Sequence, residues 1–366
     1  MDERNFSLGF SLAPRIGPKG FQKLIRSFGL VEKAWKGSSS GFKKAGIGEK
    51  AFAKFDEFRR GFDVREYLRK LKRARVEFIP FGGKYYPERL KKIDSPPIGL
   101  FTKGNQKLLI GTQIIAVVGA RKTTSYGREV TENLVGELCS SGFVIVSGMA
   151  LGVDGVGHKS AIDNRGSTIA ILGCGVDCPY PRENEKLYEE ILDSNGLIVS
   201  EYPLGMPANQ GTFPARNRII AGISMAVLIT EAAEDSGSLI TAAHAAKQGK
   251  PVFAVPGPIT SQMSKGSLNL LKQGAILVSS AEDILKELNI KNKILNIKDT
   301  YKKSNINKTE QKIIECLESE ERTIDEISNL TKIPIAKLSI ILSEMELKGI
   351  VKNLSGKFST SSPAFL

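Results

Sequence analysis

The stretch IIAVVGARKTTSYG, residues 114–127, decides the fold class of this chain. Its apolar run leads through a polar turn into a helical pattern with Val130, Leu134 and Leu138 on one face, and Gly142 follows as a helix stop. Further apolar runs, separated by helical patterns, occur at FVIVSG (143–148), STIAILG (167–173), LIVSE (197–201), MAVLIT (225–230) and PVFAVPG (251–257). Apolar strands that alternate with helices are typical of a parallel sheet covered on both faces. The sequence therefore predicts a doubly wound, Rossmann-like α/β domain, whose ligand would bind outside the carboxyl ends of the strands.

Two smaller regions flank this domain. A glycine-centred turn precedes a helical pattern in IGPKGFQKLIRSFG (16–29) and again in KKAGIGEKAFAKF (43–55), which is similar to sterile-alpha-motif-like (SAM-like) and helix-hairpin-helix modules. Near the other end, three helical patterns and a polar hairpin predict a winged helix. We expect a helical module at 1–70, the sheet domain with its N-terminal extension at 71–290, a polar linker at 291–306 and the winged helix at 307–366.

The composition is that of an ordinary globular protein. Of 366 residues, 41% are hydrophobic and 25% are charged. No apolar run approaches the roughly 20 residues that span a bilayer, and MDERNFSLGF lacks the layout of a signal peptide. Four scattered cysteines do not indicate a disulfide framework. We therefore expect a cytoplasmic protein that does not bind membranes.

The net charge of +13 is unevenly distributed. Residues 1–110 hold 25 Lys+Arg against 11 Asp+Glu, residues 111–306 hold 19 of each, and residues 307–366 hold 8 against 9. The basic first third suggests a polyanionic partner, although a lysine-rich solvated surface explains the composition equally well. The winged helix has too little positive charge to bind phosphates well, so contact with protein is as good an interpretation as contact with DNA.

The turns after the strands favour anion binding over nucleotide binding. GARKTTSYG is not G-x-G-x-x-G, the second strand ends in Ser147-Gly148 where an acid for ribose would stand, and no P-loop motif occurs. The first turn instead offers small residues, hydroxyls and Arg121 near a helix start. Cations follow other strands at Arg182 and Lys186, and in FPARNRIIAG (213–222) at Arg216 and Arg218.

Cations spread over several strand ends suit several phosphates in a row. Arginine offers a planar fork to phosphate, and a single-stranded nucleic acid along the sheet edge would fit. Phe213 and Tyr180 are candidate stacking surfaces, and the Ser236-Gly237-Ser238 turn is a candidate nest of N–H groups for phosphate. On a helix, Arg216 and Arg218 diverge by about 200°, so we expect one to face the ligand and the other to face an acid or a carbonyl.

Catalytic and metal sites are disfavoured by the sequence. Asp154 is placed to cap a helix. Zinc binding by His158, His244, Cys174 and Cys178 would need ligands from different loops, and the cysteines lack the usual C-x2-C spacing. We recognise neither a Ser-His-Asp order nor paired carboxylates at strand ends, so we expect no enzyme activity, no metal and no cofactor.

Several long motifs resemble the DNA-processing protein A family, also called Smf. They are YPERLKKIDSPPIGLFTKGN (86–105), VVGARKTTSYG (117–127), VSGMALGVDGVGHKSA (146–161), TIAILGCGVDCPYPREN (168–184), EYPLGMPANQGTFPARNRIIAG (201–222), EAAEDSGSLITAAHAAKQGKPVFAVPG (231–257) and SKGSLNLLKQGA (264–275).

The resemblance implies a homodimer, built through the Rossmann-like domain, that binds and protects single-stranded DNA. Such a protein loads the RecA recombinase during DNA uptake (natural transformation) and recombination, with single-strand-binding protein as a further candidate partner. The expected DNA contacts are Gly119, Arg121, Ser147, Gly148, Arg182, Lys186, Phe213, Arg216, Asn217, Arg218, Ser236, Gly237 and Ser238.

Two alternative functions remain open. SGSLIT resembles the P-G-G-x-G-T-x-x-E loop of lysine-decarboxylase-like nucleotide phosphoribohydrolases, but alignment on Thr241 puts His244 where their catalytic glutamate stands. A sequence-specific transcription factor acting through residues 307–366 is disfavoured by the charge of that region.

Overall fold

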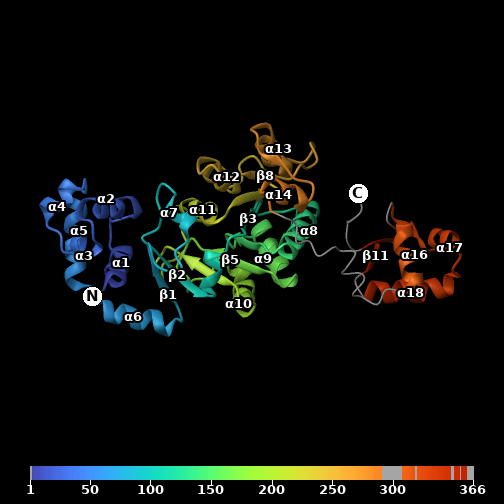
Figure 1. The fold of residues 1–366 in the computed structure, drawn as a ribbon, viewed down its shortest axis with the longest axis horizontal. Coiled ribbons are helices and arrows are strands. Elements are labelled where there is room, and N and C mark those ends of the chain that lie inside the picture. The colour runs from blue at the N-terminus through green and yellow to red at the C-terminus, as the bar shows by residue number, and fades with distance from the viewer. Residues whose placement is uncertain (1, 291–306, 318–319, 348–349, 355, 361–366) are drawn as a thin grey trace. The chain divides into compact units, whose positions relative to one another are not determined.

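The computed structural model describes residues 2–290, 307–317, 320–347, 350–354 and 356–360. The chain divides into two compact units, residues 1–292 and residues 293–366 (Figure 1). The predicted linker at 291–306 lies outside the described residues.

A mostly parallel sheet forms the centre of the larger unit. Its strands run in the order β1-β2-β6-β5-β4-β3-β7-β8-β9. Their bounds are β1 Glu77–Pro80, β2 Gly99–Gly104, β3 Ile114–Val118, β4 Val144–Ser147, β5 Ser167–Ile171, β6 Leu197–Ser200, β7 Ala226–Ile229, β8 Val252–Ala254 and β9 Ile276–Leu277. Strands β3 to β9 pair in parallel, whereas β1 and β2 join the β6 side in antiparallel orientation. The predicted doubly wound fold is confirmed.

The strand order reverses beside β3. This strand pairs with β4 on one side, where Ala116 lies opposite Val146, and with β7 on the other, where Ala116 lies opposite Val227. The chain builds outward from β3 through β4, β5 and β6, and then returns to the other side of β3 for β7. A reversal of this kind opens a crevice at the carboxyl ends of the two central strands. It predicts where a ligand would bind before any side chain is considered.

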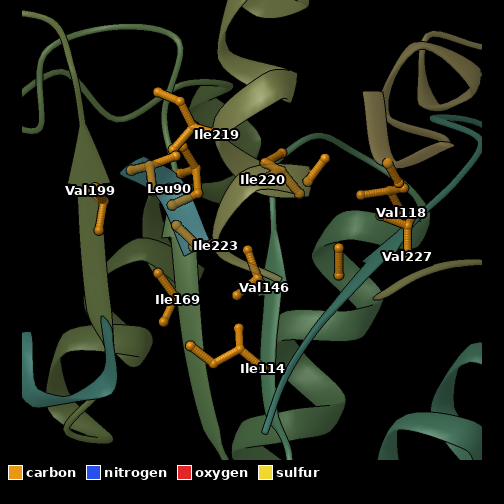
Figure 2. Packing of buried hydrophobic residues seen from close by; sticks show 14 of the residues in the cluster. Leu90, Ile114, Val118, Val146, Ile169, Val199, Ile219, Ile220, Ile223 and Val227 are labelled. Carbon is orange, nitrogen blue, oxygen red and sulfur yellow. The ribbon is translucent and has the colours of Figure 1, made fainter. Parts of the chain in front are cut away.

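Helices cover both faces of the sheet because alternate strand residues point to opposite sides. One face of the sheet, with Ile114, Ala116 and Val118 of β3, packs against α7 Glu88–Lys91, α11 Thr212–Ile223 and α12 Ser238–Lys247. Figure 2 shows Leu90, Ile219 and Ile223 on this face above the strands. Ile115 and Val117 point the other way, toward α8 Ser125–Ser140, α9 Val153–Asp163 and α14 Ala281–Glu287. The region also contains α10 Glu185–Asp193, α13 Lys265–Lys272 and three short 3-10 helices, Gln106–Ile110, Arg182–Asn184 and Gln262–Ser264.

An aromatic core holds the N-terminal helical module together. The helices are α1 Glu3–Leu12, α2 Pro18–Phe28, α3 Val31–Trp35, α4 Ser39–Lys44, α5 Glu49–Gly61 and α6 Val64–Arg73. The rings of Phe10 and Phe55 stack at 5.1 Å, and Trp35 lies edge-on to both. As predicted, a glycine turn precedes α2 and another precedes α5.

The smaller unit is a winged helix, as predicted. It contains α16 Lys308–Leu317, α17 Ile324–Thr331 and α18 Ile335–Leu347, with a sheet of β10 Arg322–Thr323, β11 Val351–Leu354 and β12 Lys357–Thr360. Thr323 and Glu326 form a capping box at the start of α17. In the described parts of the chain, no helix is long and apolar enough to cross a membrane.

Candidate nucleic-acid interface

A pocket of about 670 Å³ lies at the reversal of strand order, and we call it the switch-point pocket. The loops after β3, β4, β5 and β7 and the N-terminal parts of α11 and α12 form its walls. Eight of the predicted contact residues line it: Gly119, Arg121, Phe213, Arg216, Asn217, Ser236, Gly237 and Ser238. These residues span more than a hundred positions of the chain, from Gly119 to Ser238, and the parallel strands bring them to one edge.

The loop after β3 carries the exposed cations Arg121 and Lys122 into the pocket. Glu231, a buried acid just after β7, holds this loop. Its Oε2 accepts hydrogen bonds from Thr123 Oγ1 at 2.9 Å and Thr124 N at 2.8 Å, and its Oε1 accepts from Thr124 Oγ1 at 2.6 Å. The two cations therefore stand on a loop that is fixed to the neighbouring strand. Glu231 was not predicted, although an acid directly after a buried strand is a usable signal.

An aromatic pair forms another wall of the pocket. The rings of Tyr180 and Phe213 lie 5.4 Å apart at an interplanar angle of 33°, and Tyr180 is 47% exposed. The guanidinium carbon of Arg121 lies 5.7 Å from the centre of the Phe213 ring. A cation and two rings therefore lie within reach of one nucleotide, which carries both a phosphate and a base with an aromatic face.

Arg216 is the floor of the pocket and is only 4% exposed. Its Nη1 donates to the carbonyl of Gly148 at 2.8 Å and to the carbonyl of Ile171, and its Nε donates to Asn217 Oδ1 at 3.2 Å. A Cβ added at Gly148 would lie 2.6 Å from Arg216 Nη2 and 2.7 Å from Asp154 Oδ2. Glycine is thus required at this position because a charged side chain packs on each side of it.

Asp154 balances the buried charge of Arg216. Its Oδ2 accepts from the N–H of Gly148 at 3.0 Å, so it anchors the loop after β4 as well as standing in the first turn of α9. Burial raises the pKa of Asp154, and the nearby Arg216 opposes that shift. Burial likewise lowers the pKa of Arg216, and Asp154 opposes the change. The two groups therefore stabilise each other's charged forms beneath the pocket.

The Ser236-Gly237-Ser238 turn brings two hydroxyls to the pocket, and the nest formed by its N–H groups stays a prediction. The N–H of Ser236 donates to Ala233 O and that of Leu239 donates to Ser236 O, each at 3.1 Å. The two serine hydroxyls lie 2.7 Å apart, and Asn217 Nδ2 donates to Gly237 O at 3.3 Å. This turn therefore presents side-chain oxygens to the pocket and is held to α11 by Asn217.

Arg218 lies outside the pocket lining and has a partner of its own. Its Nη2 donates to Glu201 Oε2 at 2.5 Å, and both side chains are largely buried. Burial raises the pKa of Glu201, and Arg218 works against that shift. We expected one of the two α11 arginines to have an internal partner, but the structure gives one to both. Their different directions on the helix decide which partner each finds.

The other predicted contacts lie around the pocket rather than in its lining. Ser147 is fully buried and donates from Oγ to Val117 O at 2.6 Å, which ties β4 to β3. Arg182 is exposed in the 3-10 turn Arg182–Asn184 just before α10, and Lys186 is exposed in the first turn of α10, where its Nζ lies 3.7 Å from Glu190. Asn184, between them, donates from Nδ2 to Met149 O at 2.9 Å and so joins this segment to the loop after β4.

Some lining residues were not among the predicted contacts. Lys122, Gln210, Asp235 and Met263 line the pocket, and Asp235 brings an exposed negative charge. Cys174 Sγ donates to Cys178 O at 2.9 Å, and His158 Nδ1 lies 2.7 Å from Thr168 Oγ1.

Fold and pocket together define a doubly wound α/β protein with a cationic, aromatic-walled pocket at its switch point. Residues 77–289 match the family described as DNA recombination-mediator protein A, and residues 302–357 match the family described as DprA winged helix domain. The chain is 32% identical to Protein Smf of Synechocystis sp. over 97% of this chain and 98% of that relative. The chain belongs to the DNA recombination-mediator protein A family, whose members are named DprA or Smf.

Two solved structures resemble this fold closely. DNA processing protein A from Streptococcus pneumoniae is 32% identical, with a TM-score of 0.69 over 77% of this chain and 97% of that chain. DNA processing protein A from Helicobacter pylori is 34% identical, with a TM-score of 0.53 over 58% of this chain and 95% of that chain. The work on the H. pylori protein describes its single-stranded DNA binding mode.

Proposed function

We propose that this protein binds single-stranded DNA without sequence preference at the switch-point pocket. The observation that carries the proposal is the placement of Arg121 over Phe213, with Tyr180 beside it, on loops held at the carboxyl edge of the sheet. Cations attract the phosphate backbone, and aromatic rings stack on any base, so the combination favours a single strand without regard to its sequence.

The contacts have different roles in this proposal. Arg121 and Lys122 bind phosphates, Phe213 and Tyr180 stack on bases, and the hydroxyls of Ser236 and Ser238 donate to oxygens of the strand. Arg182 and Lys186 extend the cationic surface beyond the pocket. Arg216 acts from below, because its buried charge and its bonds to Gly148 and Ile171 hold the floor in place.

We take the protein to act by binding rather than by catalysis. The two carboxyl groups in the pocket lining are Asp154 and Asp235. Asp154 is buried against Arg216 and already accepts from Gly148 N, which suits a structural role. Asp235 is exposed on the turn after β7, whereas the carboxylates that act as general acid or base are usually tuned by burial and by neighbouring groups.

The proposed partners follow from the family. The description of the family as a recombination mediator supports the proposal that this protein protects incoming strands. We propose that it also loads the RecA recombinase onto them during transformation and recombination. The described binding mode of the H. pylori relative supports a single strand as the ligand. We propose a cytoplasmic homodimer for this assembly.

A titration tests the proposal. Labelled single-stranded and double-stranded oligonucleotides of equal length are added to the full chain at several salt concentrations. We expect tighter binding of the single strand, with little dependence on its sequence and a log–log salt slope of about −0.7 for each phosphate contact. Equal or tighter binding of the duplex would overturn the proposal. Loading is tested separately by measuring RecA filament nucleation on strands coated with single-strand-binding protein, which the full chain should accelerate.

A further inference from the structure

Helix α6 carries a concentration of positive charge that the pocket does not use. Its apolar side, formed by Val64, Tyr67, Leu68 and Leu71, packs into the core of the larger unit. The opposite, exposed side carries the cations Arg65, Arg69, Lys70, Lys72 and Arg73. The exposed acid on this helix is Glu66, which pairs with Lys70 at 2.8 Å.

The stability of the helix does not explain this charge. Cations in the last turn interact favourably with the helix dipole, which accounts for Lys70, Lys72 and Arg73. Arg65 stands in the first turn, where a cation is unfavourable, and Arg69 stands in the middle. Neighbouring like charges on one helix face also destabilise it. A partner that supplies negative charge would offset this cost.

The contacts of α6 join it to segments that lead toward the pocket walls. Tyr67 Oη accepts a hydrogen bond from Leu204 N at 3.1 Å, and Gly205 N donates to Asp177 Oδ1 at 2.9 Å. Tyr67 and Leu68 belong to the same core cluster as Cys178 and Leu204. The segments thus joined follow β5 and β6, and they continue to Tyr180 and to Phe213 in the pocket. In Figure 1, α6 lies at the β1 side of the sheet.

We propose that the exposed face of α6 is a second contact surface for the single strand that leaves the switch-point pocket. This inference rests on the proposed function. A helix of ten residues is about 15 Å long, so its face suits several successive phosphates rather than one anion. Arginine at positions 65, 69 and 73 follows an i, i+4, i+8 spacing, which puts the three planar forks in one row.

The test compares two variants of the full chain with equal loss of charge. R65Q/R69Q/R73Q removes the arginine row from α6, and K19Q/K23Q/R26Q removes three exposed cations from α2, another basic helix of the helical module. Glutamine keeps a good helix propensity. Each variant is titrated with a short oligothymidylate, the shortest that the unaltered protein still binds, and with one four times as long.

We expect the α6 variant to bind the short strand like the unaltered protein and to bind the long strand more weakly. Its salt slope on the long strand should fall in magnitude by up to about two units, at about 0.7 for each phosphate contact. The α2 variant should keep both affinities. Equal losses in the two variants would overturn the inference, because net charge alone would then explain the effect.

The outcome for the pocket is separable from the outcome for α6. If R121A/K122A weakens both strand lengths and the α6 variant weakens neither, the inference about α6 fails and the proposed function stands. If the unaltered protein binds no single strand of either length, the proposed function itself fails. The melting temperature of each variant shows whether its fold is intact.

Discussion

Arg216 and Arg218 lie two positions apart on α11 but have different partners. Arg216 donates hydrogen bonds to the carbonyls of Gly148 and Ile171, whereas Arg218 donates to the carboxylate of Glu201. Both are held inside the protein, but only Arg216 lines the switch-point pocket. Their substitutions should therefore have different consequences for DNA binding.

Replacing Arg216 should destabilise the fold and disable the pocket together. Arg216→Met removes the positive charge that favours the ionised form of buried Asp154, and it removes the donor to the carbonyls of Gly148 and Ile171. Each buried polar group left without a partner costs about 1–3 kcal/mol. Urea denaturation measures the loss, and the double change R216M/D154N should recover part of it. An unchanged free energy of unfolding in R216M would contradict the structural role.

Replacing Arg218 should lower stability without weakening the intrinsic affinity for a single strand. Arg218→Met leaves Glu201 largely buried and unpaired, at a cost of about 2 kcal/mol. A double-mutant cycle with Glu201→Gln should show a coupling energy, since the two groups contact each other directly. A loss of affinity in a fully folded R218M protein would instead place this residue in the DNA contact.

Charge in the pocket lining should control the salt dependence of binding. In R121A/K122A the salt slope should fall in magnitude by up to about 1.4 units, at about 0.7 for each phosphate contact. The melting temperature should hardly change because both side chains are exposed. Fluorescence titrations at several salt concentrations measure the slope.

Two controls accompany that experiment. Asp235→Asn removes a negative charge from the same lining and should strengthen binding. Lys286→Ala removes a cation that pairs with Glu282 on α14, outside the pocket lining, and should leave binding unchanged. Weaker binding in D235N would show that strand phosphates do not pass this part of the pocket.

The aromatic wall should contribute affinity without changing the salt slope. Stacking is worth about 1–3 kcal/mol per base, so Tyr180→Ala should weaken binding by roughly one to two powers of ten. Tyr180→Phe, which keeps the ring, should bind as the unaltered protein does. If Y180A and Y180F bind equally well, Tyr180 does not stack on the strand.

His158 should make the fold less stable on mild acidification. Burial, helped by nearby Arg216, lowers the pKa of His158 from 6.5 to about 3. Between these values the unfolded chain binds a proton that the folded protein does not. The contribution of neutral His158 to the free energy of unfolding is therefore fully present above pH 6.5. It is lost as the pH falls toward 3, at up to about 1.4 kcal/mol per pH unit.

Thermal melts between pH 7 and pH 5.5 check this behaviour. The slope of stability against pH should be shallower in His158→Gln than in the unaltered protein. In His244→Gln the dependence of stability on pH that comes from His158 should remain, because His158 is intact. His244 is partly exposed, and burial lowers its pKa less strongly. Identical slopes in H158Q and the unaltered protein would contradict the buried neutral state.

The sequence predicted the centre of this fold better than its edges. The six strands with continuous apolar runs were found because a strand buried on both faces needs such a run. Strands β1, β2 and β9 escaped prediction. β9 has two residues, and β1 ends in Pro80, so neither shows a readable period.

The site was predicted as a set of loops but not as a set of contacts. Strand order explains why the residues after β3 and β7 meet, and the alternation of strands and helices already indicated that edge. No local sequence pattern indicates that Glu231 accepts hydrogen bonds from Thr123 and Thr124. Nor does any pattern show that both Arg216 and Arg218 have partners inside the protein. These pairings join segments that only the tertiary fold brings together, so their partners cannot be read from spacing.

The switch-point pocket has a thermodynamic consequence because its walls come from segments between Val118 and Met263. An unfolded chain has no such pocket, so a single strand binds there only to the folded protein and stabilises it against unfolding. By mass action, a strand present at 100 times its Kd would add about 2.7 kcal/mol to the free energy of unfolding. A larger supply of single strands would therefore lower the unfolded fraction of the protein and slow its proteolysis. The bound DNA would protect the protein that binds it.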